Sequence, residues 1–300
     1  MSENNVWISG IVASVLFGFL LAWAGSDGSL QVYGLPLFSI SVAFAFLIQW
    51  MCFVPSFLFQ TEKYFDLTGS LTYVSILIFV LIMSNDLGLR ELTIGFFVLL
   101  WAFRLGMFLF FRIRSAGEDS RFKVIKTNFL QFLMTWSLQG LWVCVTCGAA
   151  LAAITSDKEA PLGLFFLAGS ILWFVGFFVE VLADHQKSQF NREPANSGKF
   201  ICTGLWAWSR HPNYFGEIML WSGLAILAIP VLEGWQHLTL ISPIFVFLLL
   251  TKISGINLLE RQADSRPCSK ETCKAQQPNM RGPMKTCDEC TEATCARSAC

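Results

Sequence analysis

Long apolar stretches, separated by short polar segments, recur along the first 256 residues of the chain. An α-helix needs about 20 mostly apolar residues to cross the hydrocarbon core of a bilayer, and most of these stretches approach that length. They are too long for strands or for core helices of a soluble domain. The pattern therefore predicts eight membrane-spanning helices, at residues 6–24, 38–59, 71–83, 92–111, 136–154, 162–182, 214–232 and 238–256.

The number of these helices and the start of one of them leave alternatives open. The stretch at 71–83 is short, so a partly buried or re-entrant helix there would leave seven spans. The helix at 136–154 could begin as early as Asn128, as an interfacial segment. The first stretch ends in Ala22-Trp23-Ala24, which fits a signal-peptide cleavage site. Because no Lys or Arg precedes that stretch, we interpret it as a retained helix.

The composition agrees with a membrane protein. Hydrophobic residues make up 54% of the chain and charged residues 14%, against about 25% charged residues in a soluble domain. The 21 basic residues balance the 21 acidic ones, so the charge gives no reason to expect a nucleic-acid partner. We predict an all-α fold, a polytopic integral membrane helical bundle of seven or eight transmembrane helices embedded in a lipid bilayer.

Basic residues are unevenly distributed among the connecting segments. With eight spans, the second, fourth and sixth connections hold ten Lys or Arg residues, and the opposite connections hold only Arg90 and Lys158. An excess of Lys and Arg marks the cytoplasmic side of a membrane protein. We therefore expect both termini in the cytoplasm, at either an ER membrane or a bacterial inner membrane.

The last part of the chain differs from the rest. Residues 264–300 contain no Leu, Ile, Val, Phe, Trp or Tyr, yet they hold six of the ten cysteines. Such a segment cannot bury an apolar core, so we expect a disordered, Cys-rich, low-complexity tail. A zinc site built around Cys287-Asp-Glu-Cys290 is the alternative. We divide the remainder into N-terminal transmembrane helices at 1–60 and a membrane domain at 61–263.

Ionisable residues lie inside several predicted spans. Arg104 lies in the middle of the fourth span, Glu180 and Asp184 lie one turn apart at the end of the sixth, and Glu217 lies in the seventh. Charges in hydrocarbon are costly and by default indicate a functional site. Together these charges cluster toward the cytoplasmic halves of their spans, which predicts a polar cavity for a charged cytosolic cofactor. An internal ion pair of Arg104 with Glu217 is the structural alternative.

The most informative motif lies between the sixth and seventh predicted spans. It reads Ser209-Arg210-His211-Pro212-Asn213-Tyr214-Phe215-Gly216-Glu217, with Trp221 one turn further on. Pro212 suits the first turn of a helix. Arg210 and His211 then lie at a helix N-terminus, where an anion is favoured. Asn213 and Glu217 are four residues apart on one face and could hold a carboxamide or ribose hydroxyls.

This motif resembles the steroid 5-alpha-reductase C-terminal superfamily, and within it the DUF1295 branch. The similarity covers about residues 62–264. Three further stretches agree with it: Thr-Glu-Lys-Tyr-Phe-Asp-Leu-Thr-Gly at 61–69, Trp-Ala-Phe-Arg-Leu-Gly at 101–106 with the charged segment 112–122, and Glu180 with Ala-Asp-His-Gln-Lys at 183–187. The short pattern Arg-His-Pro-x-Tyr-x-Gly alone is also shared by sterol reductases and isoprenylcysteine carboxyl methyltransferases.

The resemblance implies NADPH-dependent reduction of a carbon–carbon double bond in a lipid or steroid-like enone. It implies that Asn213 and Glu217 face the nicotinamide and that Asp184 holds the ribose and diphosphate. The complete set of implied cofactor-binding residues is Arg104, Arg112, Arg121, Glu180, Asp184, Lys187, Arg210, His211, Asn213, Tyr214, Glu217 and Trp221.

A Tyr or a protonated acid can stabilise the enolate that forms as hydride reaches an enone. We take Tyr64, Glu62 and Asp66 as candidate catalytic residues, and we expect no metal.

Two other functions remain open. One is an S-adenosylmethionine-dependent enzyme similar to the isoprenylcysteine methyltransferases, and the other is a non-catalytic membrane protein that keeps the fold. In addition, the resemblance leads us to expect an aromatic, basic segment after Asp264, and the Cys-rich tail stands in its place. A translated frameshift, a mis-spliced gene model or genuine divergence would each produce such an ending.

Overall fold

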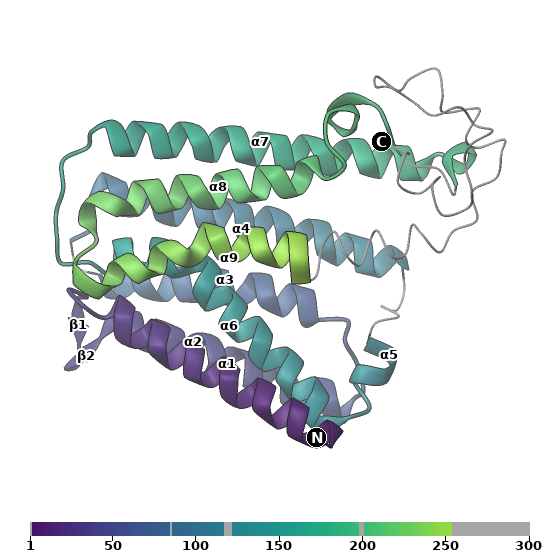
Figure 1. Ribbon diagram of the computed structural model, residues 1–300, viewed down its shortest axis with the longest axis horizontal. Coiled ribbons are helices and arrows are strands. Elements are labelled where there is room, and N and C mark those ends of the chain that lie inside the picture. The colour runs from purple at the N-terminus through teal and green to yellow at the C-terminus, as the bar shows by residue number, and fades with distance from the viewer. Residues whose placement is uncertain (1, 85, 117–121, 198–200, 254–300) are drawn as a thin grey trace. The chain divides into compact units, whose positions relative to one another are not determined.

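The computed structural model of the protein describes residues 2–84, 86–116, 122–197 and 201–253. The tail at 264–300 and Arg121 lie outside this part of the chain. The described residues are almost entirely helical (Figure 1). The α-helices are α1 (Glu3–Gly25), α2 (Leu37–Leu58), α3 (Phe65–Met83), α4 (Leu89–Ala116), α5 (Phe122–Ile125), α6 (Phe129–Ile154), α7 (Leu164–Arg192), α8 (Pro212–Ala228) and α9 (Ser242–Leu248).

Shorter elements complete the architecture. A two-stranded antiparallel hairpin, β1 (Gln31–Val32) and β2 (Leu35–Pro36), connects α1 to α2. Short 3₁₀ turns are found at Pro194–Asn196, Gly204–Ala207 and Ile229–Val231, a longer 3₁₀ helix at Gly234–Ile241, and one π-helical turn at Leu249–Ile253. The last two of these continue into α9 on either side, so the eighth span is only partly α-helical.

Eight helical segments of the described chain are long and apolar enough to cross a membrane. This finding confirms an integral, multi-pass, all-α membrane protein and favours eight spans over seven. Helix α6 starts at Phe129, and the Asn128 side chain caps it by accepting a hydrogen bond from Gln131 N at 3.1 Å. The early start that we had kept as an alternative for this helix is therefore confirmed.

Helix α3 begins six residues earlier than predicted and has 19 residues. The polar residues of its first turns had suggested a connection. In the structure the Thr68 and Thr72 hydroxyls donate to the carbonyls of Tyr64 and Thr68, each at 2.7 Å. Because these groups are satisfied within the helix itself, they do not interrupt it.

Helix α7 extends ten residues beyond its predicted end, to Arg192. Its 29 residues correspond to a length of about 44 Å, whereas the hydrocarbon core of a bilayer is about 30 Å thick. The final turns, which carry Asp184 and Lys187, therefore project beyond the hydrocarbon.

The chain divides into two compact units. Unit 1 comprises residues 1–171 and 222–243, and unit 2 comprises residues 172–221 together with the chain from 244 onward. In unit 1, α6 is the most buried span, and it packs against α1, α2, α3 and α4. The N-terminal half of α6 contributes to an aromatic cluster built around Phe53, Phe122, Phe132 and Trp136.

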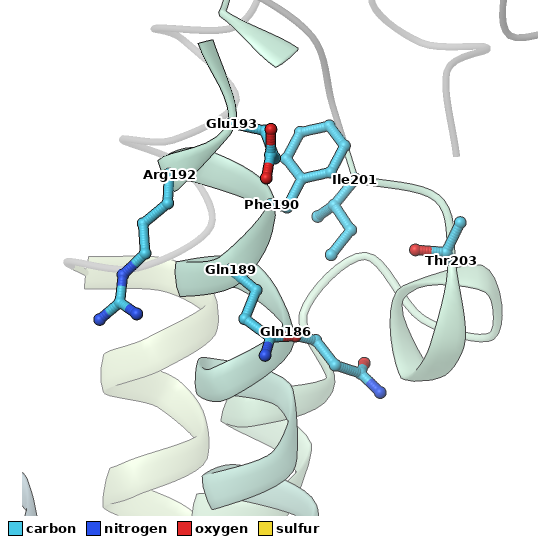
Figure 2. A pocket seen from close by; sticks show the side chains of 7 residues that line it. All are labelled: Gln186, Gln189, Phe190, Arg192, Glu193, Ile201 and Thr203. Carbon is cyan, nitrogen blue, oxygen red and sulfur yellow. The ribbon is translucent and has the colours of Figure 1, made fainter. Parts of the chain in front are cut away.

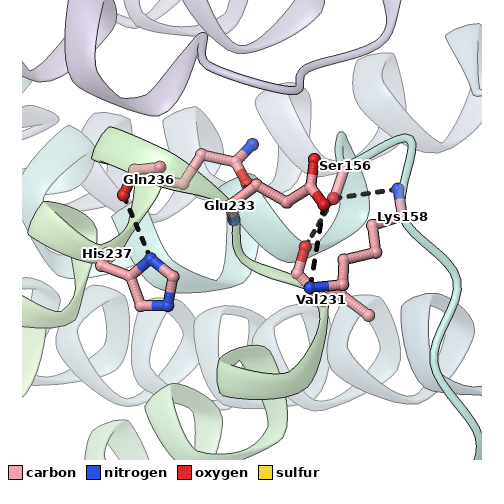
Figure 3. A network of polar contacts seen from close by, with 7 residues as sticks. Ser156, Lys158, Val231, Glu233, Gln236 and His237 are labelled. Carbon is pink, nitrogen blue, oxygen red and sulfur yellow. Dashed lines mark hydrogen bonds and ion pairs between the residues drawn. The ribbon is translucent and has the colours of Figure 1, made fainter.

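A polar network joins the connections at one end of unit 1 (Figure 3). Ser156 Oγ donates to Val231 O at 2.6 Å and accepts from Lys158 N at 3.2 Å. Glu233 and Gln236 form a capping box at the start of the 3₁₀ segment Gly234–Ile241, and Lys158 Nζ lies 3.7 Å from Glu233 Oε1. Since Lys158 and Glu233 are 42% and 50% exposed, their ion pair contributes less to stability than the backbone contacts.

Candidate functional site

Two glycines bring α7 and α8 into backbone contact within unit 2. A Cβ added at Gly216 would lie 2.6 Å from both Gly176 O and Glu180 N. A Cβ added at Gly176 would lie 2.6 Å from Gly216 O and Leu220 N. Small residues permit this kind of close approach between membrane helices. The glycine of the sequence motif therefore sets the helix separation, and it places Glu180 directly beside α8.

Two carboxylates of α7 lie beside this contact. Glu180 and Asp184 are 3% and 8% exposed. Asp184 Oδ1 accepts a hydrogen bond of 3.2 Å from Asn213 Nδ2, which joins α7 to the first turn of α8. The other atom of the same amide, Asn213 Oδ1, is buried and has no hydrogen-bond partner among the described residues. The structure thus brings together Glu180, Asp184 and Asn213, three of the cofactor-binding residues that the resemblance implies, and Asn213 Oδ1 is an acceptor available to a ligand.

Helix α8 begins at Pro212, as the sequence predicts. The His211 ring stacks on Tyr214, with ring centroids 5.3 Å apart and an interplanar angle of 11°. The backbone N–H of His211 donates to Ser209 Oγ at 3.2 Å, and Arg210 is exposed. A cationic side chain and a stacked aromatic pair therefore flank the start of the helix.

The turn Gly204–Ala207 folds back on the end of α7. Trp206 Nε1 donates to Ala183 O at 3.0 Å, and the Leu205 N–H donates to Gln186 Oε1 at 3.0 Å. Gly204 has a φ of +62°, and its missing side chain leaves room for Gln186. Lys187, predicted to bind the cofactor, places its Nζ 4.8 Å from the centre of the Trp206 ring. Part of the role of Lys187 is therefore to hold this turn.

An open cavity of about 460 Å³ lies at the same end of unit 2 (Figure 2). Its volume is in the range of small-molecule sites. The last turns of α7 provide most of its lining, and the connection after them provides the rest. The lining residues are Gln186, Gln189, Phe190, Arg192, Glu193, Ile201 and Thr203. Sequence reasoning named none of the seven as a site residue, and for the four on α7 the reason is that it ended the helix at residue 182.

The remaining predicted cofactor residues are more dispersed. Trp221 and Glu217 lie on α8 in unit 2, and Trp221 is 1% exposed. Arg104 lies on α4 in unit 1, with its guanidinium carbon 5.6 Å from the centre of the Phe108 ring. Arg112 also lies on α4, but its side chain is outside the described part of the chain. A cofactor role for these residues stays a prediction.

The three candidate catalytic residues lie in unit 1, at the start of α3. Glu62 is 5% exposed, and its Oε2 lies 2.8 Å from Lys126 Nζ. Tyr64 is 57% exposed, and Asp66 is half-buried in the first helical turn. The partner of Glu62 was not predicted, since no pattern in the sequence relates the connection before α3 to the one before α6.

Comparison with known sequences agrees with the resemblance seen in the motifs. Residues 52–279 match the family described as "Protein of unknown function (DUF1295)". The match extends beyond both ends of the similarity that the motifs had indicated, and it includes the first part of the Cys-rich tail. No solved structure matches the chain.

Curated relatives match over shorter stretches. The chain is 38% identical over 71 residues to 3-oxo-5-alpha-steroid 4-dehydrogenase 1 of Bos taurus, covering 23% of this chain and 27% of the relative. It is 39% identical over 62 residues to Steroid 5-alpha-reductase DET2 of Gossypium hirsutum, covering 21% and 24%. It is 33% identical over 89 residues to the Probable O-methyltransferase ustE of Ustilaginoidea virens, covering 29% and 31%. The chain thus spans less than a third of the length of each relative.

Proposed function

Because the chain belongs to the DUF1295 family of the steroid 5-alpha-reductase superfamily, we propose that it is a membrane-embedded, NADPH-dependent reductase. Its substrate would be a lipid or steroid-like enone, reduced at a carbon–carbon double bond. The observation that carries the proposal is the group formed where α7 meets α8, in which Asp184 binds Asn213 beside the buried Glu180. The partial similarity to two proteins named as steroid reductases supports the same function.

The residues of this group fit a nicotinamide cofactor. Because Asp184 accepts from the Asn213 amide nitrogen, the amide oxygen is the atom left for a ligand, and it suits the N–H of a carboxamide. Asp184 and Glu180 could accept from ribose hydroxyls, and the exposed Arg210 could pair with a phosphate through two parallel hydrogen bonds. NADPH, when bound, would supply the hydride, and the protein would orient it and exclude water.

The glycine contact gives this group its rigidity. Since Gly176 and Gly216 allow no gap between the backbones of α7 and α8, side chains on the two helices hold fixed positions relative to one another. A rigid arrangement of this kind lowers the cost of ordering the site when a ligand binds.

The contacts at the start of α3 narrow the choice of substrate-polarising residue. In its ion pair with Lys126, Glu62 is a carboxylate, which accepts hydrogen bonds and does not donate them. An enone carbonyl needs a donor to stabilise the developing enolate. Tyr64 has a hydroxyl donor, and Asp66 has one when protonated. We therefore favour Tyr64 and Asp66 over Glu62 for this role.

The test is ligand-induced stabilisation of the purified full chain. NADPH should raise the unfolding temperature, and S-adenosylmethionine should not. Asn213→Ala and Glu217→Gln should abolish the NADPH effect, whereas Asn191→Ala and Glu159→Gln, which replace exposed residues, should keep it. Transfer of deuterium from labelled NADPH into an extracted lipid would identify the reaction. NADPH stabilisation that persists in both site variants would refute the proposed site.

A methyltransferase is the second candidate, because one curated relative is named as a probable O-methyltransferase. The short motif at the start of α8 is compatible with either cofactor. Stabilisation by S-adenosylmethionine without any response to NADPH would establish this candidate in place of the reductase. A chain that responds to neither compound would be a non-catalytic member of the family.

We further propose that both termini are cytoplasmic. Eight spans place the ends of the chain on one side, and the connections on that side carry the excess of Lys and Arg. The α7–α8 group would then face the compartment that contains NADPH.

A further inference from the structure

The interior of unit 1 contains polar side chains whose hydrogen bonding is incomplete. Gln49 on α2 and Trp136 on α6 are both 0% exposed. Within the described residues, three of the buried atoms without a hydrogen-bond partner lie in this region: Gln49 Oε1, Trp136 Nε1 and Gln139 Oε1. Leaving a polar atom unpaired in apolar surroundings is costly, so such atoms indicate where a ligand can bind.

The other ends of both amides are already engaged. Gln49 Nε2 donates to Thr72 Oγ1 at 2.9 Å, and Gln139 Nε2 donates to Phe65 O at 3.2 Å. These bonds to α3 determine which way each amide is turned, so each leaves its oxygen as an acceptor. By contrast, the neighbouring Trp50 is satisfied, because its Nε1 donates to Ser137 Oγ at 3.0 Å.

The three unpaired atoms belong to residues that lie close together. Trp136 and Gln139 are three residues apart, so they are neighbours on one face of α6. Both contact Phe65: the rings of Trp136 and Phe65 are 5.1 Å apart, and Gln139 binds the Phe65 carbonyl. Gln49 lies against the next residue of α6, since a Cβ added at Gly140 would be 3.4 Å from Gln49 Cγ. One region between α2, α3 and α6 therefore offers two acceptors and one donor.

We propose that this region binds the hydroxyl group of a sterol-like lipid. A hydroxyl carries one donor and two acceptor lone pairs, so it can donate to a glutamine oxygen and accept from Trp136 Nε1. A ketone oxygen accepts only, and it would leave both amide oxygens unpaired. The aromatic cluster of Phe53, Phe122, Phe132 and Trp136 adjoins this region and suits a rigid apolar skeleton.

This inference rests on the proposed function in taking the ligand to be a steroid-like lipid. It adds that the substrate carries a hydroxyl as well as its enone. The binding region lies wholly in unit 1 and uses none of the residues assigned to the cofactor. Its test therefore needs no NADPH, and failure of either proposal can be recognised separately.

The test is equilibrium binding of tritium-labelled cholesterol to the purified full chain, with competition by unlabelled cholesterol or by cholest-5-ene, which lacks the hydroxyl. Cholesterol should compete at least about tenfold better, because it makes two additional hydrogen bonds. Trp136→Phe should weaken cholesterol binding about fivefold more than it weakens the binding of cholest-5-ene, because only cholesterol loses a hydrogen bond. Trp50→Phe removes an indole N–H that is already paired, so this matched control should keep the preference for cholesterol.

Stability distinguishes a lost ligand contact from a damaged fold. Without sterol, Trp136→Phe loses part of a buried ring but also removes an unpaired donor, so any fall in its unfolding temperature comes from packing alone. Trp50→Phe loses packing and also the hydrogen bond to Ser137 Oγ. Equal competition by the two sterols, or no saturable binding of cholesterol, would overturn the proposal. A preference for cholesterol that is undiminished in Trp136→Phe would overturn it as well and would point to bound water as the partner of these atoms.

Discussion

Replacing Gly216 by alanine tests the close backbone contact between α7 and α8 in unit 2. The added methyl group would lie 2.6 Å from Glu180 N and from Gly176 O, whereas ordinary van der Waals contact begins at 3.4 Å. Both atoms belong to the backbone of α7, so neither can turn away as a side chain would. The variant can be accommodated only if α7 and α8 separate by about 0.8 Å at this point.

That separation has two consequences. Forcing one additional methyl group into a packed interface costs about 1–3 kcal/mol of unfolding free energy. The hydrogen bond between Asn213 and Asp184, now 3.2 Å, would lengthen to as much as about 4.0 Å and be lost, at a further cost of about 1 kcal/mol. We expect Gly216→Ala to lower the unfolding free energy by about 2–4 kcal/mol in total and to weaken NADPH binding.

The assay is thermal unfolding of the purified protein, with and without NADPH. Gly163→Ala is the matched control, because a Cβ at Gly163 would meet nothing within 4 Å. Gly176→Ala should resemble Gly216→Ala, and the double variant should cost less than the sum, since the helices need separate only once. If Gly216→Ala unfolded at the same temperature as Gly163→Ala, the glycine contact would not be what holds α7 against α8.

Three further predictions concern unit 1 and the topology. Lys126→Met should cost about 2–4 kcal/mol of unfolding free energy by leaving Glu62 buried and unpaired, and adding Glu62→Gln should restore most of it; an unchanged unfolding temperature would contradict the ion pair. Arg90 donates to Leu227 O and Pro161 O, each at 2.8 Å. Arg90→Lys should therefore lower the unfolding free energy by about 1–3 kcal/mol, since one ammonium cannot replace both donors of the guanidinium. An unchanged unfolding temperature would show that these two hydrogen bonds do not stabilise the fold. If the C-terminus is cytoplasmic, a green fluorescent protein fused to it should fluoresce in bacteria, and an alkaline phosphatase fused to it should be inactive. The reverse pattern would show that the C-terminus lies on the opposite side of the membrane.

Local patterns in the sequence predicted much of the fold. Spans are predictable because a bilayer imposes the same requirement on every one of them. The start of α8 at Pro212 was predictable for a similarly local reason, since proline suits a first helical turn. The shared face of Glu180 and Asp184 follows from helical periodicity alone. These features depend on residues within one or two turns of each other.

Features that depend on distant residues were not predictable in the same way. The ion pair of Glu62 with Lys126 joins residues 64 positions apart, and the bond from Trp206 to Ala183 depends on how a connection folds back. The cavity was missed because polar residues after Leu182 read as a connection, whereas α7 continues through them to Arg192. A hydropathy pattern reports where the membrane ends, which is not always where a helix ends.

The close contact at Gly216 also bears on how the motif should be interpreted. The pattern Arg-His-Pro-x-Tyr-x-Gly resembles both reductases and methyltransferases, and in this chain two of its residues have packing roles. Pro212 starts α8, and Gly216 lets α8 touch α7. Packing roles of this kind are compatible with more than one cofactor, so the motif itself cannot decide between them. The proposed choice of NADPH over S-adenosylmethionine rests instead on the polar atoms that this packing brings together, and among those of the described residues Asn213 Oδ1 is a buried acceptor without a partner.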